Sequence, residues 1–289
     1  MANLKDIRKR ISSVRSTQQV TKAMKMVAAA KLRRAQEAAE NARTYSDKLT
    51  ELLRSLATSA GEDAHPLLRG GSDAALHTIL ISADRGLCGG YNANMLRATD
   101  EFLDSAEGAG ATLTVVGRRG FDHFKKREGL TLVSEHVDTP FDMTLARALA
   151  AEATERFLAG ESGGVRIAYT RFRSAISQEP VVERLLPVAA EDSGSAEGNA
   201  DAAADYVYEP NVWQILATLL PRYVETRVYH AMLESAASEH GSRMTAMDSA
   251  TNNASDMIDR LTLEMNRARQ ASITTELMEI VGGAEALKG

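Results

Sequence analysis

The chain has 289 residues, of which 44% are hydrophobic and 25% are charged, and its net charge is −5. Aromatic residues make up only 5% and there are 6 prolines, so an all-β sandwich or barrel is disfavoured. The single cysteine excludes a disulfide framework and a cysteine-based metal cage. No apolar run approaches the ~20 residues that span a bilayer, so the sequence predicts no transmembrane segment.

Positive charge is concentrated at the N-terminus. Residues 1–36 hold ten Lys or Arg and one acid, a net of +9, which leaves −14 for the other 253 residues. This asymmetry indicates an anionic partner for the N-terminal segment. Three hypotheses fit the charge: a mitochondrial transit peptide, a nucleic-acid-binding arm, and a structural helix that meets an acidic protein.

Hydrophobic spacing favours the structural helix. A ladder of alternating fours and threes runs through Ile7, Ile11, Val14, Gln18, Thr21, Lys25, Ala28, Leu32, Ala35, Ala39, Ala42, Ser46, Leu49, Leu53 and Leu56. Eleven of these fifteen are aliphatic or Ala, as in a coiled coil. Since no Gly or Pro lies between Ala2 and Ala60, residues 1–60 are predicted to form one helix of about 58 residues, roughly 87 Å long. A cleaved transit peptide would not keep register with such a helix.

The middle of this N-terminal ladder is poor in large aliphatic residues. From Gln18 to Ser46 it offers small or polar residues, with Leu32 as its one large aliphatic and Lys25 at a core-type position. Such a seam buries little area, and a fully buried lysine is costly. We therefore expect another surface around this stretch, as when a long helix is inserted into the cavity of a partner.

Residues 61–209 are predicted to form a central α/β domain. Short β-branched runs alternate with amphipathic segments, which predicts a small doubly wound sheet. The expected strands are Leu76–Ser82, Thr112–Gly117, Val165–Thr170 and, more weakly, Leu130–Val137; the expected helices are Asn94–Ala106, Phe121–Arg127 and Thr144–Leu158. Residues 190–205 carry five acids and no base, which is typical of a solvated loop.

A Gly-rich turn in this domain raises the alternative of an enzyme. Residues 84–90 (DRGLCGG) follow the first expected strand, where an α/β enzyme binds a nucleotide or phosphate. The glycines at 86–90 match neither GxGxxG nor GxxxxGK[ST], and Gly117–Gly120 is equally ambiguous. The six histidines show no spacing tied to Cys88 as a nucleophile. The sequence therefore predicts no catalytic residue, cofactor or metal site, and the glycines are interpreted as strand-to-helix turns.

Residues 210–289 are predicted to hold a second long helix, from Arg222 to Val281. Gly241 is the only glycine of that range, and no proline occurs in it. Its ladder reads Leu233, Ala237, His240, Met244, Met247, Thr251, Ala254, Ile258, Leu261, Met265 and Ala268. Each long helix would supply the partner that the other lacks. The predicted fold is thus an antiparallel coiled coil of the two terminal helices plus the small α/β domain, an α-rich α/β protein.

Four segments together resemble the gamma subunit of F-type ATP synthases. The clearest is residues 273–286 (ITTELMEIVGGAEA), with the run ARQAS at 268–272 before it. Residues 7–28, residues 84–90 and residues 206–210 (YVYEP) match the same family in the same order. The resemblance covers the chain from about residue 3 to residue 287.

The resemblance implies a function as well as a fold. In this family the helix pair is the rotor shaft inside a ring of alternating alpha and beta subunits, and the α/β domain lies outside that ring. The resemblance implies one copy per complex, contacts with the epsilon subunit and the c ring, and no nucleic-acid partner. It further implies a non-catalytic subunit that couples proton flow to ATP synthesis or hydrolysis.

The resemblance also implies contact residues and a location. The residues expected to contact beta subunits are Met24, Lys25, Arg269, Gln270, Thr274 and Glu276. A bacterial origin is favoured because the match begins at residue 3, which implies indirect, peripheral association with the cytoplasmic side of the plasma membrane. The single cysteine excludes the cysteine-pair redox switch of chloroplast relatives.

Overall fold

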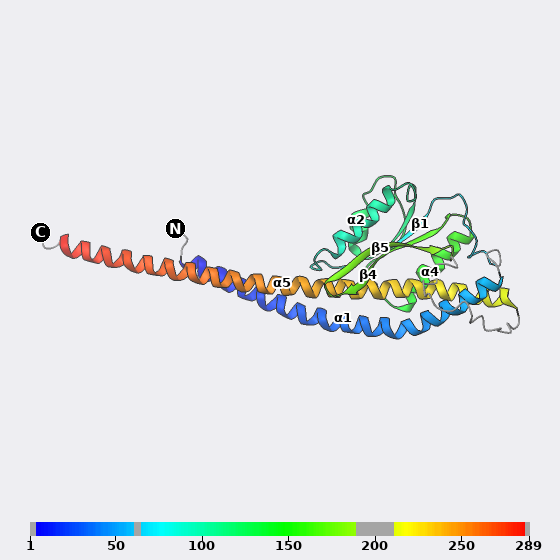
Figure 1. The fold of residues 1–289 in the computed structure, drawn as a ribbon. Coiled ribbons are helices and arrows are strands. Elements are labelled where there is room, and N and C mark those ends of the chain that lie inside the picture. The colour runs from blue at the N-terminus through cyan, green and yellow to red at the C-terminus, as the bar shows by residue number, and fades with distance from the viewer. Residues whose placement is uncertain (1–3, 61–64, 189–210, 287–289) are drawn as a thin grey trace. The chain divides into compact units, whose positions relative to one another are not determined.

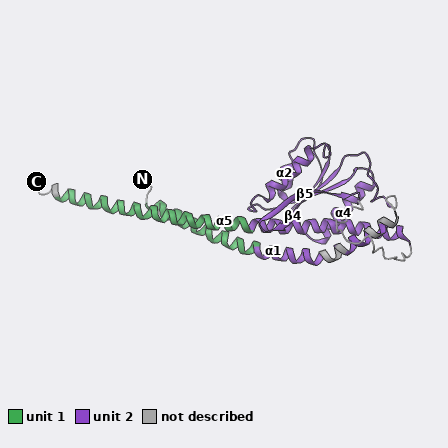
Figure 2. Cartoon of the chain, viewed as in Figure 1, with its two compact units in different colours: residues 1–28, 244–289 green, residues 29–243 purple. Residues whose placement is uncertain are grey.

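The computed structural model describes residues 4–60, 65–188 and 211–286. They divide into two compact units: residues 1–28 with 244–289, and residues 29–243 (Figure 2). The helices α1 (Leu4–Ala60) and α5 (Val212–Ala286) each contribute to both units. The expected domain boundary after residue 60 borders residues 61–64, and the expected boundary after residue 209 falls within residues 189–210; both ranges lie outside the described residues. The expected acidic loop at 190–205 also lies outside them.

The larger unit, residues 29–243, is built on a mixed five-stranded sheet of order β3-β2-β1-β4-β5 (Figure 1). Its strands are β1 (His77–Ile81), β2 (Thr112–Val116), β3 (Thr131–His136), β4 (Val165–Ser174) and β5 (Ser177–Leu186). The first four are parallel, and β5 pairs antiparallel with β4 as a hairpin. All four expected strands are present, and β5 is an addition that the sequence did not indicate.

Helices cover both faces of this sheet, as expected of a doubly wound domain. The helices between strands are α2 (Tyr91–Asp104), α3 (Arg118–Phe124) and α4 (Met143–Leu158). Successive residues of a strand point to opposite faces. Ile79 and Ile81 of β1 therefore join one core with α4, α5 and the end of α1, while Leu80 joins a second core with α2 and α3.

The α5 helix begins ten residues before the predicted start and includes Pro221. A proline inside a helix costs about 3 kcal/mol. Leu216 and Leu220, both with no exposed area, lie in the first core beside it and offset that cost. Leu49, Leu53 and Leu56 at the end of α1 belong to the same core, so both terminal helices are anchored in the α/β domain.

Candidate functional site

The smaller unit consists of the N-terminal part of α1 packed against the C-terminal part of α5. The Thr21 and Thr251 hydroxyl oxygens lie 2.8 Å apart, and Lys25 Nζ donates to Asp248 Oδ1 at 2.6 Å. Residue numbers rise along one helix as they fall along the other, so the pair is antiparallel, as predicted. All fifteen positions of the N-terminal ladder and all eleven of the C-terminal ladder are buried or half-buried.

Lys25 shows how the polar seam is accommodated. Its side chain keeps 42% of its area exposed and is paired with Asp248, whose side chain is 47% exposed. The charge is therefore not taken fully out of water, and the cost expected for a buried lysine is largely avoided. Met24 beside it is half-buried, while Val20, Met26 and Val27 of the same helix are exposed apolar side chains that the sequence analysis did not single out.

The C-terminal end of α5 has no packing partner among the described residues. By the pairing of Thr21 with Thr251, residue 4 at the start of α1 lies level with about residue 268, and Figure 1 shows α5 continuing past that point. Every side chain from Arg269 to residue 284 is exposed. This segment includes five large apolar side chains: Ile273, Leu277, Met278, Ile280 and Val281.

The six predicted contact residues fall into two groups. Four of them lie on the unpaired end of α5: Arg269, Gln270, Thr274 and Glu276. There the Thr274 hydroxyl donates to the Gln270 carbonyl at 2.9 Å, and the Ser272 hydroxyl donates to Glu276 Oε1 at 3.1 Å. Met24 and Lys25 lie in the paired region, level with residue 248. The two groups are about 32 Å apart along the helix axis, because 21 residues separate 248 from 269 at ~1.5 Å each. The structure does not bring them together.

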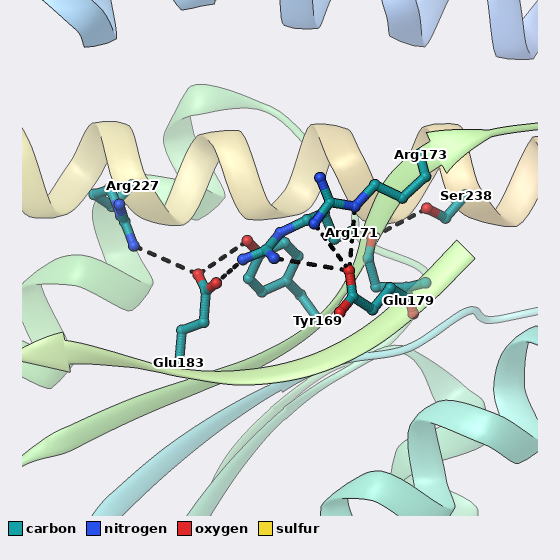
Figure 3. A network of polar contacts seen from close by, with 8 residues as sticks. Tyr169, Arg171, Arg173, Glu179, Glu183, Arg227 and Ser238 are labelled. Atoms are coloured by element: carbon teal, nitrogen blue, oxygen red, sulfur yellow. Dashed lines mark hydrogen bonds and ion pairs between the residues drawn. The ribbon is translucent and has the colours of Figure 1, made fainter. Parts of the chain in front are cut away.

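In the larger unit, a charged network joins α5 to the β4–β5 hairpin (Figure 3). Glu183 of β5 accepts a hydrogen bond from the Tyr169 hydroxyl at 3.0 Å, forms an ion pair with Arg171, and lies 3.5 Å from Arg227 of α5. Glu179 pairs with Arg173 at 3.1 Å. The side chains of Glu183, Arg171 and Arg227 are about one-quarter exposed. Their ion pairs are therefore stronger than pairs between fully exposed side chains.

Two buried serines add direct hydrogen bonds between α5 and β4. Ser238 Oγ donates to the Thr170 carbonyl at 3.0 Å, and the Thr170 N–H donates to Ser235 Oγ at 3.3 Å. Both serines are fully buried. Together with the shared apolar core, these contacts fix α5 rotationally on the sheet of its own unit.

The Gly-rich turn at 86–90 also serves to hold α5. Ser242 Oγ donates to the Cys88 carbonyl at 2.7 Å, and Arg243 Nη2 donates to the Gly86 carbonyl at 3.2 Å. Burial raises the pKa of the Cys88 thiol, which opposes its use as a nucleophile. Burial, followed by the charges of Arg243 and Lys31, lowers the pKa of His240 to about 4, so this imidazole is neutral at pH 7.

A carboxylate of the chain itself sits where an α/β enzyme would bind an anion. Asp84 Oδ1 accepts the backbone N–H of Arg118, at the start of α3, at 2.9 Å and that of Asp138 at 3.0 Å. Gly117 before α3 has φ +98°, and a Cβ there would lie 2.1 Å from the Ser82 carbonyl oxygen, so only glycine fits this turn. The glycines act as turn residues, and this geometry argues against the nucleotide-binding alternative.

Within the described ranges, no three His, Cys, Asp or Glu side chains are grouped so as to hold a metal ion. None of the helices, over the residues that the structure describes, carries an apolar stretch long enough to cross a membrane. The described chain thus presents two notable surfaces, the exposed end of α5 and the exposed Lys and Arg side chains between residues 5 and 34 of α1, which we call the basic face of α1. Its third notable feature is the set of contacts that holds α5 on the sheet.

Comparisons with known proteins agree with this arrangement. A family model described as ATP synthase matches residues 3–287. The ATP synthase gamma chains of Geobacter metallireducens and Moorella thermoacetica are 47% and 49% identical to this chain, over 100% of both chains in each case. These relatives are bacterial.

Solved structures show the same fold. A chain in the central stalk and c-ring structure of the Tetrahymena thermophila mitochondrial ATP synthase matches with a TM-score of 0.60 and 25% identity, over 80% of this chain and 99% of that one. A chain of the Euglena gracilis mitochondrial ATP synthase matches with a TM-score of 0.65 at 21% identity, over 98% of this chain and 94% of that one. The chain therefore belongs to the ATP synthase gamma chain family and is the non-catalytic central-stalk rotor subunit of that complex.

Proposed function

We propose that this chain carries rotation between the c ring and the catalytic ring through α5. The observation that carries the proposal is the continuity of this helix. It is uninterrupted from Val212 to Ala286, its first part is fixed to the sheet by a core and a charged network, and its last part is exposed. Torque applied to the α/β domain would therefore be carried along this continuous helix toward its exposed end.

The exposed end of α5 is the proposed contact with the beta subunits near the top of the shaft. Arg269, Gln270, Thr274 and Glu276 present charged and hydrogen-bonding groups there without being engaged in the core. Exposed charge pairs are worth about 0–1 kcal/mol each, so such contacts can break and re-form at every step of a turn. The summed field of the ring would then set orientation more than any single pair.

Met24 and Lys25 form the second proposed contact, about 32 Å lower on the shaft. Here the basic face of α1 would meet acidic loops of beta subunits. The pairing of Lys25 with Asp248 leaves two-fifths of the lysine side chain exposed, so it remains accessible to a carboxylate of the ring. Contact at two heights would resist tilting of the shaft as well as transmit torque.

The assignment to a complex has further consequences for partners and location. One copy per complex would occupy the axis of the ring, because a single shaft fills it. The α/β domain would contact the epsilon subunit and the c ring, and the complex would lie on the cytoplasmic side of a bacterial plasma membrane. The chain would reach the membrane only through these partners.

Reconstitution tests the contact residues directly. The chain is mixed with alpha and beta subunits and assembled with the membrane sector in vesicles, and ATP-driven proton pumping is compared with ATP hydrolysis. Replacing Arg269 and Gln270 by Ala is expected to lower pumping per ATP hydrolysed. Lys126→Ala, an exposed charge in the α/β domain, is the matched control. Unchanged coupling in the Arg269→Ala, Gln270→Ala variant would refute the proposed contact.

A further inference from the structure

An ion pair between Lys25 and Asp248 joins α1 to α5 in the smaller unit. Lys25 Nζ lies 2.6 Å from Asp248 Oδ1, and the two side chains keep 42% and 47% of their area exposed. The pair therefore lies at the rim of the helix–helix contact, where a charged group from outside can also reach the ammonium. A pair this exposed is weak, since exposed ion pairs favour the bonded state by about fivefold at most.

A buried polar contact one helical turn away holds these two side chains opposite each other. The Thr21 and Thr251 hydroxyl oxygens lie 2.8 Å apart, and Thr251 Oγ1 donates to the Met247 carbonyl at 2.7 Å. Thr21 is only 8% exposed, so this contact lies inside the helix pair. Thr21 is four residues before Lys25, and Thr251 is three residues after Asp248, so each threonine shares a helix face with the charged residue of its helix. The carboxylate therefore stays close to the lysine even when the ammonium turns away from it.

The charges along both helices set Asp248 apart. It is the one acid of α5 between Arg243 and Asp256. On α1, residues 7–36 contain nine Lys or Arg and no acid. Asp248 thus brings one negative charge of the chain itself against the middle of a long basic stretch, and it does so at Lys25, a residue of the proposed contact with the catalytic ring.

We propose that Asp248 is a positioning residue that limits how tightly Lys25 holds a carboxylate of the catalytic ring. This inference rests on the proposed contact between Lys25 and a beta subunit. A carboxylate of the ring must compete with Asp248 for the ammonium, and Asp248 takes the ammonium back when the ring carboxylate moves away. Lys25 then always has a counter-charge, and its contact with the ring stays weak enough to break at each step of a turn.

Loss of Asp248 should act in the opposite direction to loss of a merely structural ion pair. Asp248→Asn removes the competing carboxylate, so the ring should bind the chain more tightly, by up to about fivefold, and each detachment should slow by up to the same factor. If Asp248 served only to join α1 to α5, its loss would leave binding to the ring unchanged or weaken it. Asp248→Glu keeps a carboxylate and should restore both binding and detachment.

The test is assembly and rotation of the full chain with alpha and beta subunits. The affinity of each variant for the alpha–beta ring is titrated, and the speed of rotation at saturating ATP is recorded at low salt and at about 1 M salt, where the screening length is about 3 Å. Asp248→Asn should bind more tightly and rotate more slowly at low salt, and both differences should shrink at high salt. The matched control is Asp256→Asn, which removes an equal charge from an exposed position of the same helix and should change neither value as much.

A second background separates this inference from the contact on which it rests. Lys25→Met removes the ammonium and should loosen binding to the ring, and in that background Asp248→Asn should do no more than Asp256→Asn does. If Lys25→Met leaves binding and rotation unchanged, the contact of Lys25 with the ring is itself wrong. If Lys25→Met loosens binding but Asp248→Asn, in the otherwise unaltered chain, either matches Asp256→Asn or weakens assembly, the contact stands and the role of Asp248 is overturned.

Discussion

The Glu183 carboxylate of β5 contacts both Arg171 of β4 and Arg227 of α5, and Glu183→Gln tests how firmly the sheet and α5 are joined. The change leaves Arg171 and Arg227 in place but removes the carboxylate that both contact, together with the ionic acceptor of the Tyr169 hydroxyl. Hydrogen bonds to charged groups contribute about 1.5–3 kcal/mol each when desolvated. The side chains are about one-quarter exposed, so we expect a discounted total loss of about 2–3 kcal/mol in the free energy of unfolding.

Thermal and urea unfolding of the full chain measure this loss. For a unit of this size, about 2–3 kcal/mol corresponds to a fall in Tm of about 5–10 °C. The control is Glu37→Gln, which breaks an ion pair with Arg33 whose side chains are 59% and 83% exposed, and it should cost less than about 0.5 kcal/mol. If Glu183→Gln costs no more than Glu37→Gln, the charged network does not secure α5 on the sheet.

Three further predictions concern buried polar groups and the exposed helix end. Burial lowers the pKa of His77 to about 4, below its ordinary 6.5, so the unfolded chain binds this proton before the folded chain does as pH falls. The free energy of unfolding should therefore decrease by about 3 kcal/mol between pH 6.5 and pH 4. His77→Gln should flatten that part of the curve of unfolding free energy against pH. Asp84→Ala should cost about 1–3 kcal/mol in urea unfolding because two N–H groups lose their acceptor, whereas Asp84→Asn, which keeps the oxygen, should cost less than about 1 kcal/mol. Leu277→Ser should change the Tm of the isolated chain little, since the side chain is 56% exposed, but should weaken assembly with alpha and beta subunits in a pull-down titration; equal assembly would contradict an apolar contact there.

The long helices could be predicted from the sequence because their signal is repeated many times. Every predicted ladder position is at least half-buried, since a 4–3 spacing maintained over seven heptads leaves one stripe to face a partner. The start of α5 was missed because Pro221 reads as a helix breaker. Only the tertiary core, in which Leu216 and Leu220 are fully buried, explains why the helix runs through it.

The second strand of the hairpin was not predictable by the same means. Residues 177–186 (SQEPVVERLL) contain Pro180 and three charges, which reads as a loop. Proline is tolerated at the edge of a sheet, where its missing N–H faces away from the neighbouring strand. Two of the charges, Glu179 and Glu183, pair with Arg171 and Arg173 of the neighbouring strand, and Glu183 also pairs with Arg227 of α5, which is far away in the sequence.

The candidate site was predictable in part. Lys25 stood out because it breaks an apolar ladder, but its partner Asp248 is one acid among many in the sequence. Asp84 lay within a recognised turn, yet its two backbone donors follow different strands and meet only at the edge of the folded sheet. The six contact residues came from family resemblance and remain predictions.

Single-molecule rotation tests directly whether this chain turns inside the ring of alpha and beta subunits. A bead is attached to the α/β domain of this chain in a complex with immobilised alpha and beta subunits, and ATP is added. We expect unidirectional rotation of the bead in steps that follow ATP hydrolysis, with less rotation per ATP in the Arg269→Ala, Gln270→Ala variant. ATP hydrolysis at an undiminished rate while the chain stays fixed relative to the ring would contradict it.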